Sequence, residues 1–226
     1  MARSVIVTGG FGVLGQAVAE AFAAAGDKVA RVDFVPTASH PLAGALDIGG
    51  VDLTDAAASQ SAIDQAAKAH GGLDVLVNIA GGFAWETLAD GNLDTWARMS
   101  AMNLISNATI TKLALPLLQK SQAGRIVSIG AGGAVKAAAG MGAYAASKAG
   151  VHRLTEALAE ELAGTSVTVN AVLPSIIDTP TNRKDMPNAD TSQWVQPAAL
   201  AEVILFLASP AARAITGALI PVSRGG

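Results

Sequence analysis

The stretch VIVTGGFGVLGQAVAEAFAAAG, residues 5–26, decides the fold. It begins as a short apolar run, passes through several glycines and continues as an Ala-rich segment with helical spacing. A buried strand that turns directly into a helix is the first unit of many α/β domains. Gly10, Gly12 and Gly15 also fit the pattern G-x-G-x-x-G, in which the backbone approaches a pyrophosphate at a helix N-terminus. The stretch therefore predicts a phosphate-binding loop, the alternative being a tight turn that binds no ligand.

Similar apolar runs recur along the chain and alternate with Ala-rich segments. The predicted strands cover residues 4–9, 28–34, 73–81, 125–131, 166–174 and 217–222. The predicted helices cover residues 15–25, 55–70, 94–118 and 143–163. Continuous apolar strands that alternate with helices indicate a parallel sheet covered on both faces. Without a linker or repeat, residues 1–226 are expected to form a single doubly wound Rossmann domain with a mostly or wholly parallel sheet.

Composition excludes several classes of function. The 226 residues include no cysteine, which rules out disulfides, thiolate catalysis and cysteine-based metal sites. The three histidines lack ligand spacing, so we expect no metal. A net charge of −3 without a long basic run argues against nucleic acid and anionic membranes as partners. No apolar stretch suits a signal peptide or a membrane span, so a cytoplasmic location is expected.

Asp33 indicates which dinucleotide the loop binds. It ends the second predicted strand, where a carboxylate accepts hydrogen bonds from the adenosine ribose hydroxyls. A 2′-phosphate would meet this negative charge, so we expect NAD to be preferred over NADP. Arg31 could soften that preference, although its more ordinary role is a surface charge at a strand edge. Asp52 follows a possible third strand and is either an adenine contact or a turn residue.

The single tyrosine of the chain lies in GMGAYAASKAG, residues 140–150. Tyr144 and Lys148 are four residues apart on a predicted helix, so their side chains share one face. A neighbouring ammonium favours the phenolate, so we expect the pKa of Tyr144 to be lowered toward neutrality. A phenol tuned in this way can donate or accept a proton in catalysis. The alternative is a ring that fills a gap in a small-residue helix.

These motifs together resemble the short-chain dehydrogenase/reductase family. TGGFGVLG, VNIAGG, the Asn of MNLISN, YAASKAG and VNAVLPSIIDTP follow the order and spacing of that family across nearly the whole chain. The resemblance implies that Tyr144 is the acid/base, that Lys148 tunes it and binds ribose, and that Asn103 belongs to a water relay. It also implies the following cofactor-binding residues: Gly9, Gly10, Gly12, Leu14, Gly15, Asp33, Asp52, Asn78, Ala80, Gly81, Lys148, Pro174, Ile177 and Thr179.

The chain departs from the family pattern at two positions. Thirteen residues before Tyr144, where the family has a serine that polarises a carbonyl, stands Ala131, whereas Ser128 is expected to face the other side of the sheet. The middle glycine of the loop is at 12 instead of 13, where this chain has Val. Both departures, and the segment LPSIIDTPTNRKDMPNADTSQW at 173–194, resemble the dihydropteridine reductase branch of the family.

A conjugated pterin ring does not need a serine at its carbonyl, so quinonoid dihydropteridine is the leading expected substrate. The expected substrate residues are Phe83, Trp85, Ala131 and Asn182; packing in a lid or an interface is the alternative for the aromatic residues and for Trp194. Two other functions stay open, namely a dehydrogenase for another alcohol, ketone or conjugated carbonyl and a non-catalytic NAD-sensing regulator. A homodimer or homotetramer built through helices 94–118 and 143–163 is expected.

Overall fold

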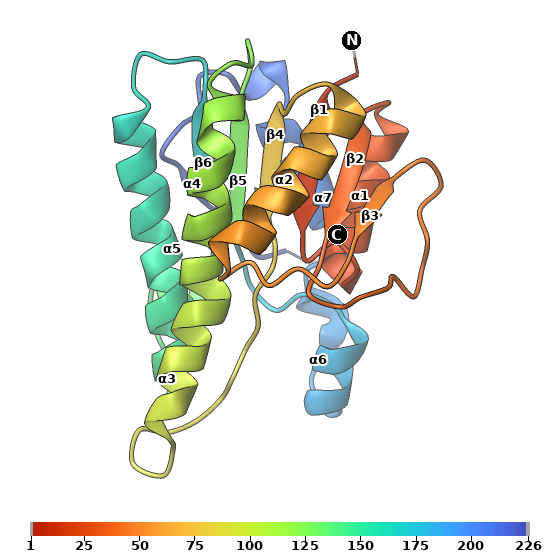
Figure 1. Ribbon diagram of the computed structural model, residues 1–226. Coiled ribbons are helices and arrows are strands. Elements are labelled where there is room, and N and C mark those ends of the chain that lie inside the picture. Colours follow the sequence, from red (N-terminus) through yellow and green to blue (C-terminus); the bar gives the residue numbers. More distant parts are fainter. Residues whose placement is uncertain (1, 225–226) are drawn as a thin grey trace.

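Seven parallel strands form the centre of the protein (Figure 1). The computed structural model describes residues 2–224. The strands are β1 (Ser4–Thr8), β2 (Lys28–Val32), β3 (Leu46–Ile48), β4 (Val75–Asn78), β5 (Arg125–Ile129), β6 (Thr168–Pro174) and β7 (Leu219–Val222). Their order in the sheet is β3-β2-β1-β4-β5-β6-β7. This is the doubly wound α/β fold that the sequence predicts, with a wholly parallel sheet.

Helices cover both faces of the sheet. They are α1 (Val13–Ala24), α2 (Ala56–His70), α3 (Leu93–Ser100), α4 (Ser106–Leu118), α5 (Gly142–Glu161), α6 (Pro180–Asp185) and α7 (Pro197–Leu207). The helices α1 and α7 pack on one face, and α2, α4 and α5 on the other. Both α3 and α6 extend beyond the carboxyl edge of the sheet, at the bottom of the view (Figure 1). None of the helices within residues 2–224 is long and apolar enough to cross a membrane.

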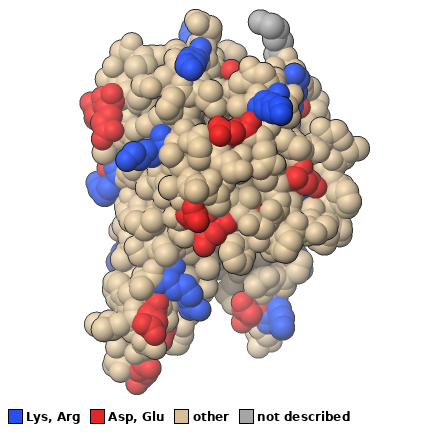
Figure 2. Space-filling view, viewed as in Figure 1, with Lys and Arg blue, Asp and Glu red and all other residues tan. Residues whose placement is uncertain are grey.

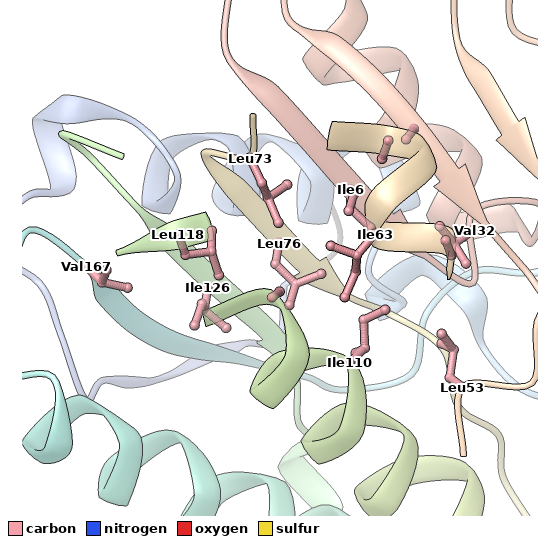
Figure 3. Close-up of a cluster of buried hydrophobic side chains, with 14 of the residues drawn as sticks. Ile6, Val32, Leu53, Ile63, Leu73, Leu76, Ile110, Leu118, Ile126 and Val167 are labelled. Atoms are coloured by element: carbon pink, nitrogen blue, oxygen red, sulfur yellow. The ribbon is translucent and has the colours of Figure 1, made fainter. Parts of the chain in front are cut away.

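The core has two halves because successive strand side chains point to opposite faces. Val5 and Val7 of β1 belong to the cluster under α1 and α7, whereas Ile6 belongs to the cluster on the other face. In that second cluster, Ile6 and Leu76 of the sheet meet Ile63 of α2 and Ile110 of α4 (Figure 3). Both faces of β1 are therefore apolar, which explains why its sequence lacks a strict alternation.

Four segments differ from the sequence prediction. The short strand β3 was only suggested by the sequence, and its three residues carry too little pattern to define it. A π-helical turn at Ala101–Ile105 interrupts the predicted helix 94–118 and separates α3 from α4. The segment 178–194, for which the sequence predicts no helix or strand, contains α6 and a 3₁₀ turn, Thr191–Gln193. The apolar segment near residue 200 is α7, which packs against α1.

The chain order places a crevice between β1 and β4. From β1 the chain moves outward through β2 and β3 and then crosses back to β4, so the direction of winding reverses there. Open α/β sheets bind ligands at such a switch point, outside the carboxyl ends of the strands. The loops that follow β1 and β4 meet at this crevice, where the amide N–H of Ala80 donates a 3.2 Å hydrogen bond to Thr8 Oγ1.

Candidate functional site

The glycine loop after β1 is shaped by close backbone contacts. Gly9 has a φ of +64°, and a Cβ there would lie 2.9 Å from the amide nitrogen of Ala80. A Cβ on Gly15 would overlap the carbonyl oxygen of Gly9, and one on Gly10 would lie 2.6 Å from the Cβ of Arg31. Gly12 is the N-cap of α1 and has no side chain to bond the first amides of the helix. These amides can therefore bind an anion.

A cavity of about 840 Å³ opens from this loop along the carboxyl edge of the sheet. Its walls come from the glycine loop, the ends of β2 and β4, the loop after β3, α3 with the following π-turn, and the start of α6. The predicted cofactor residues that line it are Gly9, Gly12, Leu14, Gly15, Asp33, Asp52, Ala80, Gly81 and Thr179. An amide-lined helix start and a carboxylate at the end of β2 in one cavity are the groups that a dinucleotide requires.

Asp33 is held in place by two backbone amides. Its Oδ2 accepts from the N–H of Phe11 at 2.9 Å, and its Oδ1 accepts from the N–H of Val35 at 3.0 Å. Each carboxylate oxygen retains a second lone pair, so the group can still accept bonds from ligand hydroxyls. Asp52 lines the same cavity and accepts from the N–H and the hydroxyl of Thr54, which lowers its pKa. Asp52 is thus a turn residue that also faces the cavity.

Arg31 is not a surface charge, so that expectation is wrong. Its side chain is fully buried, and Asp47 on the edge strand β3 accepts from Nε at 2.7 Å and from Nη2 at 2.6 Å. Nη1 donates to Gln16 on α1 and to the carbonyl oxygen of His40. The guanidinium also lies 5.3 Å from the ring centroid of Phe11. Asp47 compensates the charge of Arg31. The arginine packs against Gly10 and Phe11 and so supports the glycine loop.

Tyr144, Lys148 and Asn103 come together beside the loop that follows β4. Lys148 Nζ donates to the carbonyl oxygen of Ile129 at 2.7 Å, and a Cβ on Gly81 would lie 3.4 Å from the same nitrogen. Asn103, in the π-helical turn, accepts from the N–H of Gly82 at 2.9 Å and donates to its carbonyl oxygen at 3.1 Å. π-Helical turns are frequent at functional sites because they redirect side chains.

Asn103 also reaches α5. Its amide donates a 2.9 Å hydrogen bond to Ser147 Oγ, and that hydroxyl donates to the carbonyl oxygen of Tyr144 at 2.7 Å. A chain of three polar groups therefore connects the loop after β4 to the helical turn that carries the tyrosine.

Burial controls the protonation of the tyrosine and the lysine. It raises the pKa of Tyr144 to about 12 and lowers the pKa of Lys148 to about 8. The sequence predicts that Lys148 lowers the pKa of Tyr144, whereas in the structure this pKa is raised. Removal of water destabilises the charged phenolate, and this burial is the cause of the raised pKa of Tyr144. At neutral pH the phenol keeps its proton, and the ammonium is mostly charged.

One aromatic side chain contacts Tyr144, and a second lies over Gly140, four residues before it in the chain. The rings of Phe83 and Tyr144 have centroids 4.9 Å apart at an interplanar angle of 74°. Trp85 packs so closely over Gly140 that a Cβ there would overlap its indole, and Gly140 has a φ of +75°. Phe83 and Trp85 are 58% and 63% exposed, so both present a free apolar face. Trp194, by contrast, is buried.

Several predicted residues lie outside the cavity. The side chain of Asn78 is buried and donates to Asn107 Oδ1 and Thr111 Oγ1, so it ties β4 to α4. Its Oδ1 is buried without a hydrogen-bond partner. Asn107 in turn donates to Ser128 Oγ at 3.2 Å. These bonds tie β4 to α4 through Asn78, and the predicted part of Asn78 in cofactor binding stays a prediction.

The segment after β6 uses most of its polar groups internally. Asn182 Nδ2 donates to the carbonyl oxygen of Ile177 at 2.7 Å and braces the start of α6, while its predicted substrate contact stays a prediction. Thr179 is the N-cap of α6 and accepts from the N–H of Asn182. Pro174 ends β6, and Ile177 pairs with Val195 in an isolated bridge. Neither Pro174 nor Ile177 lines the cavity, although Thr179, which follows them in the chain, does.

Other cavity residues were not found from the sequence. Thr37, Ser39, Arg98, Met102 and Thr181 all line its wall. Arg98 and Met102 lie on the two sides of the junction between α3 and the π-turn, so helical spacing alone gives no signal for their shared direction. On the face shown in Figure 2, basic and acidic side chains are interspersed on a mostly uncharged surface.

Known proteins resemble this chain over almost its whole length. Residues 3–190 match the family model described as short chain dehydrogenase. A 2-(S)-hydroxypropyl-CoM dehydrogenase of Xanthobacter autotrophicus is 31% identical, over 98% of this chain and 95% of that protein. A meso-2,3-butanediol dehydrogenase of Serratia marcescens is also 31% identical, over 99% and 94%. The ligand-free aldohexose dehydrogenase of Thermoplasma acidophilum has a TM-score of 0.88 and 29% identity, over 98% and 92%.

Proposed function

The chain belongs to the short-chain dehydrogenase/reductase family and is an NAD(P)-dependent oxidoreductase, and from this premise we propose that it reduces a small molecule with NADH while Tyr144 donates the proton. The observation that carries the proposal is the phenol of Tyr144, whose pKa is raised to about 12 and whose ring contacts Phe83 in the loop after β4. Ala80 and Gly81 of the same loop line a cavity that has the polar groups of a dinucleotide site. Bound NADH would supply the hydride to the substrate.

The cofactor preference rests on Asp33. Its carboxylate lines the cavity at the end of β2, where it is fixed by the amides of Phe11 and Val35. There it would accept the two ribose hydroxyls of NADH and repel the 2′-phosphate of NADPH. Arg31 is fully buried and its charge is compensated by Asp47, so the arginine presents no uncompensated positive charge to a 2′-phosphate.

Each polar residue beside the cavity has a distinct role in the proposed reaction. Tyr144 gives its phenolic proton to the substrate atom that gains negative charge as the hydride arrives. Lys148 places a positive charge one helical turn away and stabilises the phenolate that remains. Asn103 holds the loop at Gly82 and, through Ser147, the backbone of Tyr144. Phe83 limits the access of water to the phenol from the solvent side.

We propose quinonoid dihydropteridine as the leading substrate. Ala131 supplies no hydroxyl where a simple carbonyl would need a polarising donor, and its side chain is buried. The free faces of Phe83 and Trp85 suit a flat conjugated ring. A second candidate is an alcohol or ketone, which the names of the hydroxypropyl-CoM and butanediol dehydrogenases favour. A cytoplasmic location stays a prediction.

The test is a spectrophotometric assay of NADH oxidation with quinonoid dihydropteridine and, in parallel, with simple ketones. Activity on the pterin that is lost in Tyr144→Phe supports the full proposal. Activity confined to ketones moves the substrate to the second candidate and leaves the proton donor in place. If Tyr144→Phe retains native turnover on every accepted substrate, the proposed proton donor is wrong.

A further inference from the structure

The carboxyl end of β5 is held at two points by α5. Lys148 Nζ donates to the carbonyl oxygen of Ile129, and two residues later the N–H of Ala131 donates to His152 Nε2 at 3.2 Å. Tyr144, Lys148 and His152 are spaced four residues apart, so their side chains follow one stripe of the helix. His152 and Ala131 are both buried, with 3% and 4% of their surfaces exposed. The bond is therefore sheltered from water.

The packing around this hydrogen bond leaves little freedom. A Cβ on Gly130 would lie 2.6 Å from His152 Nε2 and 3.1 Å from Leu173 Cδ1, so the imidazole rests directly on the glycine backbone. The carbonyl oxygen of Ala131 accepts from the N–H of Ala134 and starts the 3₁₀ turn Gly132–Ala134. The position of Ala131 thus also sets the start of the segment that leads to Gly140 and Trp85.

Only a neutral imidazole can accept this hydrogen bond, because both nitrogens of the imidazolium are donors. Burial lowers the pKa of His152, and the charges of Arg153 and Lys148 lower it further while Glu156 opposes them. These three charged groups lie on α5 itself. From the sheet side, the groups that meet the ring are the backbone at 130–131 and apolar Leu173.

We propose that neutral His152 is a positioning residue, which fixes the backbone at Ala131 relative to Tyr144 and so sets the wall of the substrate site. This proposal rests on the proposed function, in which Tyr144 is the proton donor and Ala131 lies at the substrate site. When His152 is protonated or replaced by an apolar residue, the N–H of Ala131 loses its acceptor and the wall moves. The substrate then sits less accurately against the phenol, whereas the glycine loop and Asp33 keep the cofactor.

The experiment compares His152→Gln, whose amide oxygen can still accept the bond, with His152→Leu, which cannot. The matched control is His70→Gln, because His70 Nδ1 hydrogen-bonds to Ser4 Oγ at the start of β1, away from the carboxyl ends of the strands. For each protein, kcat/KM is measured from pH 5 to 8 on the substrate found in the NADH assay, together with the dissociation constant for NADH. Nuclear magnetic resonance gives the protection factor of the Ala131 amide over the same pH range.

We expect His152→Leu to lower kcat/KM by about tenfold to a hundredfold, with NADH affinity changed less than about twofold. His152→Gln should keep native activity at neutral pH. We expect kcat/KM of the native enzyme to fall at acid pH, below the ordinary pKa of histidine, and we expect this fall to be absent in His152→Gln. Protection of the native Ala131 amide should fall over that same range of pH. His70→Gln should leave all three quantities unchanged.

Native kcat/KM and pH profile in a folded His152→Leu protein would overturn the proposal, as would an Ala131 amide whose protection does not change as His152 titrates. If His152→Leu does not fold, the His152→Gln profile and the native amide exchange decide. An enzyme that oxidises no NADH with any substrate would defeat the proposed function instead, and the exchange experiment would still test the bond.

Discussion

Arg31 and Asp47 lie directly opposite each other on the neighbouring strands β2 and β3, where two hydrogen bonds of 2.7 and 2.6 Å join them. The arginine side chain is fully buried, and the aspartate side chain is 33% exposed. A buried guanidinium is thus neutralised by a single acid on an edge strand of three residues. Removal of one partner of such a pair leaves an uncompensated buried charge, which costs far more than the pair itself contributes.

Asp47→Asn should therefore lower the free energy of unfolding by about 2 to 3 kcal/mol, less than for a completely buried pair because Asp47 is partly exposed. Urea unfolding followed by circular dichroism measures the change. Asp64→Asn on the exposed side of α2 removes the same charge and should stay within about 0.5 kcal/mol of the native value. Equal effects of the two substitutions would contradict a special role for the pair.

Asp33→Ala should narrow the preference for NADH over NADPH. The substitution removes both the proposed acceptor for the ribose hydroxyls and the negative charge that is expected to repel a 2′-phosphate. Weaker NADH binding and unchanged or tighter NADPH binding are expected from fluorescence titrations of native and variant protein. Tighter binding of NADPH than of NADH by the native protein would show that the expected preference is wrong.

Tyr144→Phe should reduce turnover by ~10² to 10⁴, the usual contribution of a general acid, while NADH still binds. Because the pKa of the phenol is about 12, native reduction should show no loss of activity from tyrosine ionisation between pH 6 and 9. Stopped-flow measurement of single turnovers at several pH values checks both expectations. Lys148→Ala should impair turnover and NADH affinity together, since the proposed roles of its ammonium are to stabilise the phenolate and to bind the ribose.

Ala131→Ser tests the substrate class. If the site holds a planar conjugated ring, the new hydroxyl lacks a partner in a buried wall, which costs roughly 1 to 3 kcal/mol. Reduction of quinonoid dihydropteridine should be unchanged or slower, and any gain should appear only on simple ketones. Steady-state assays on the two substrate classes distinguish the cases. A large gain on both classes would mean that the native site is an impaired ketone reductase.

The helices α3, α4 and α5 are expected to form the interface of a homodimer or homotetramer. Leu93, Trp96 and Ile105 are exposed along α3 and the π-turn, with 74%, 39% and 46% of their surfaces free. Exposed apolar side chains that gather into a patch favour association. Sedimentation velocity at micromolar concentration should reveal a dimer or tetramer, and Ile105→Glu should shift it toward monomer. A native monomer at that concentration is the contrary result.

The parts of the fold that follow from local chemistry were predictable. Short apolar runs revealed six of the strands, and the glycines after Thr8 located the loop that Gly9 and Gly15 form by backbone contact. The parts that depend on distant partners were not. No residue close to Arg31 in the sequence indicates that Asp47, sixteen residues later, compensates the charge of the buried arginine. The hydrogen bond between Asn182 and Ile177 likewise depends on α6. The sequence of 178–194 is polar and has no helical pattern of apolar residues, so it does not predict this helix.

The π-helical turn at Ala101–Ile105 has a consequence for how this protein can change over generations. Such a turn contains one residue more than an α-helical turn would, so it changes the direction of the side chains on its two sides relative to an unbroken α-helix. Only loss of a residue would restore an unbroken α-helix, and that would rotate Asn103 away from Gly82 or α3 away from α5. The number of residues in this segment is therefore constrained more strictly than their identity.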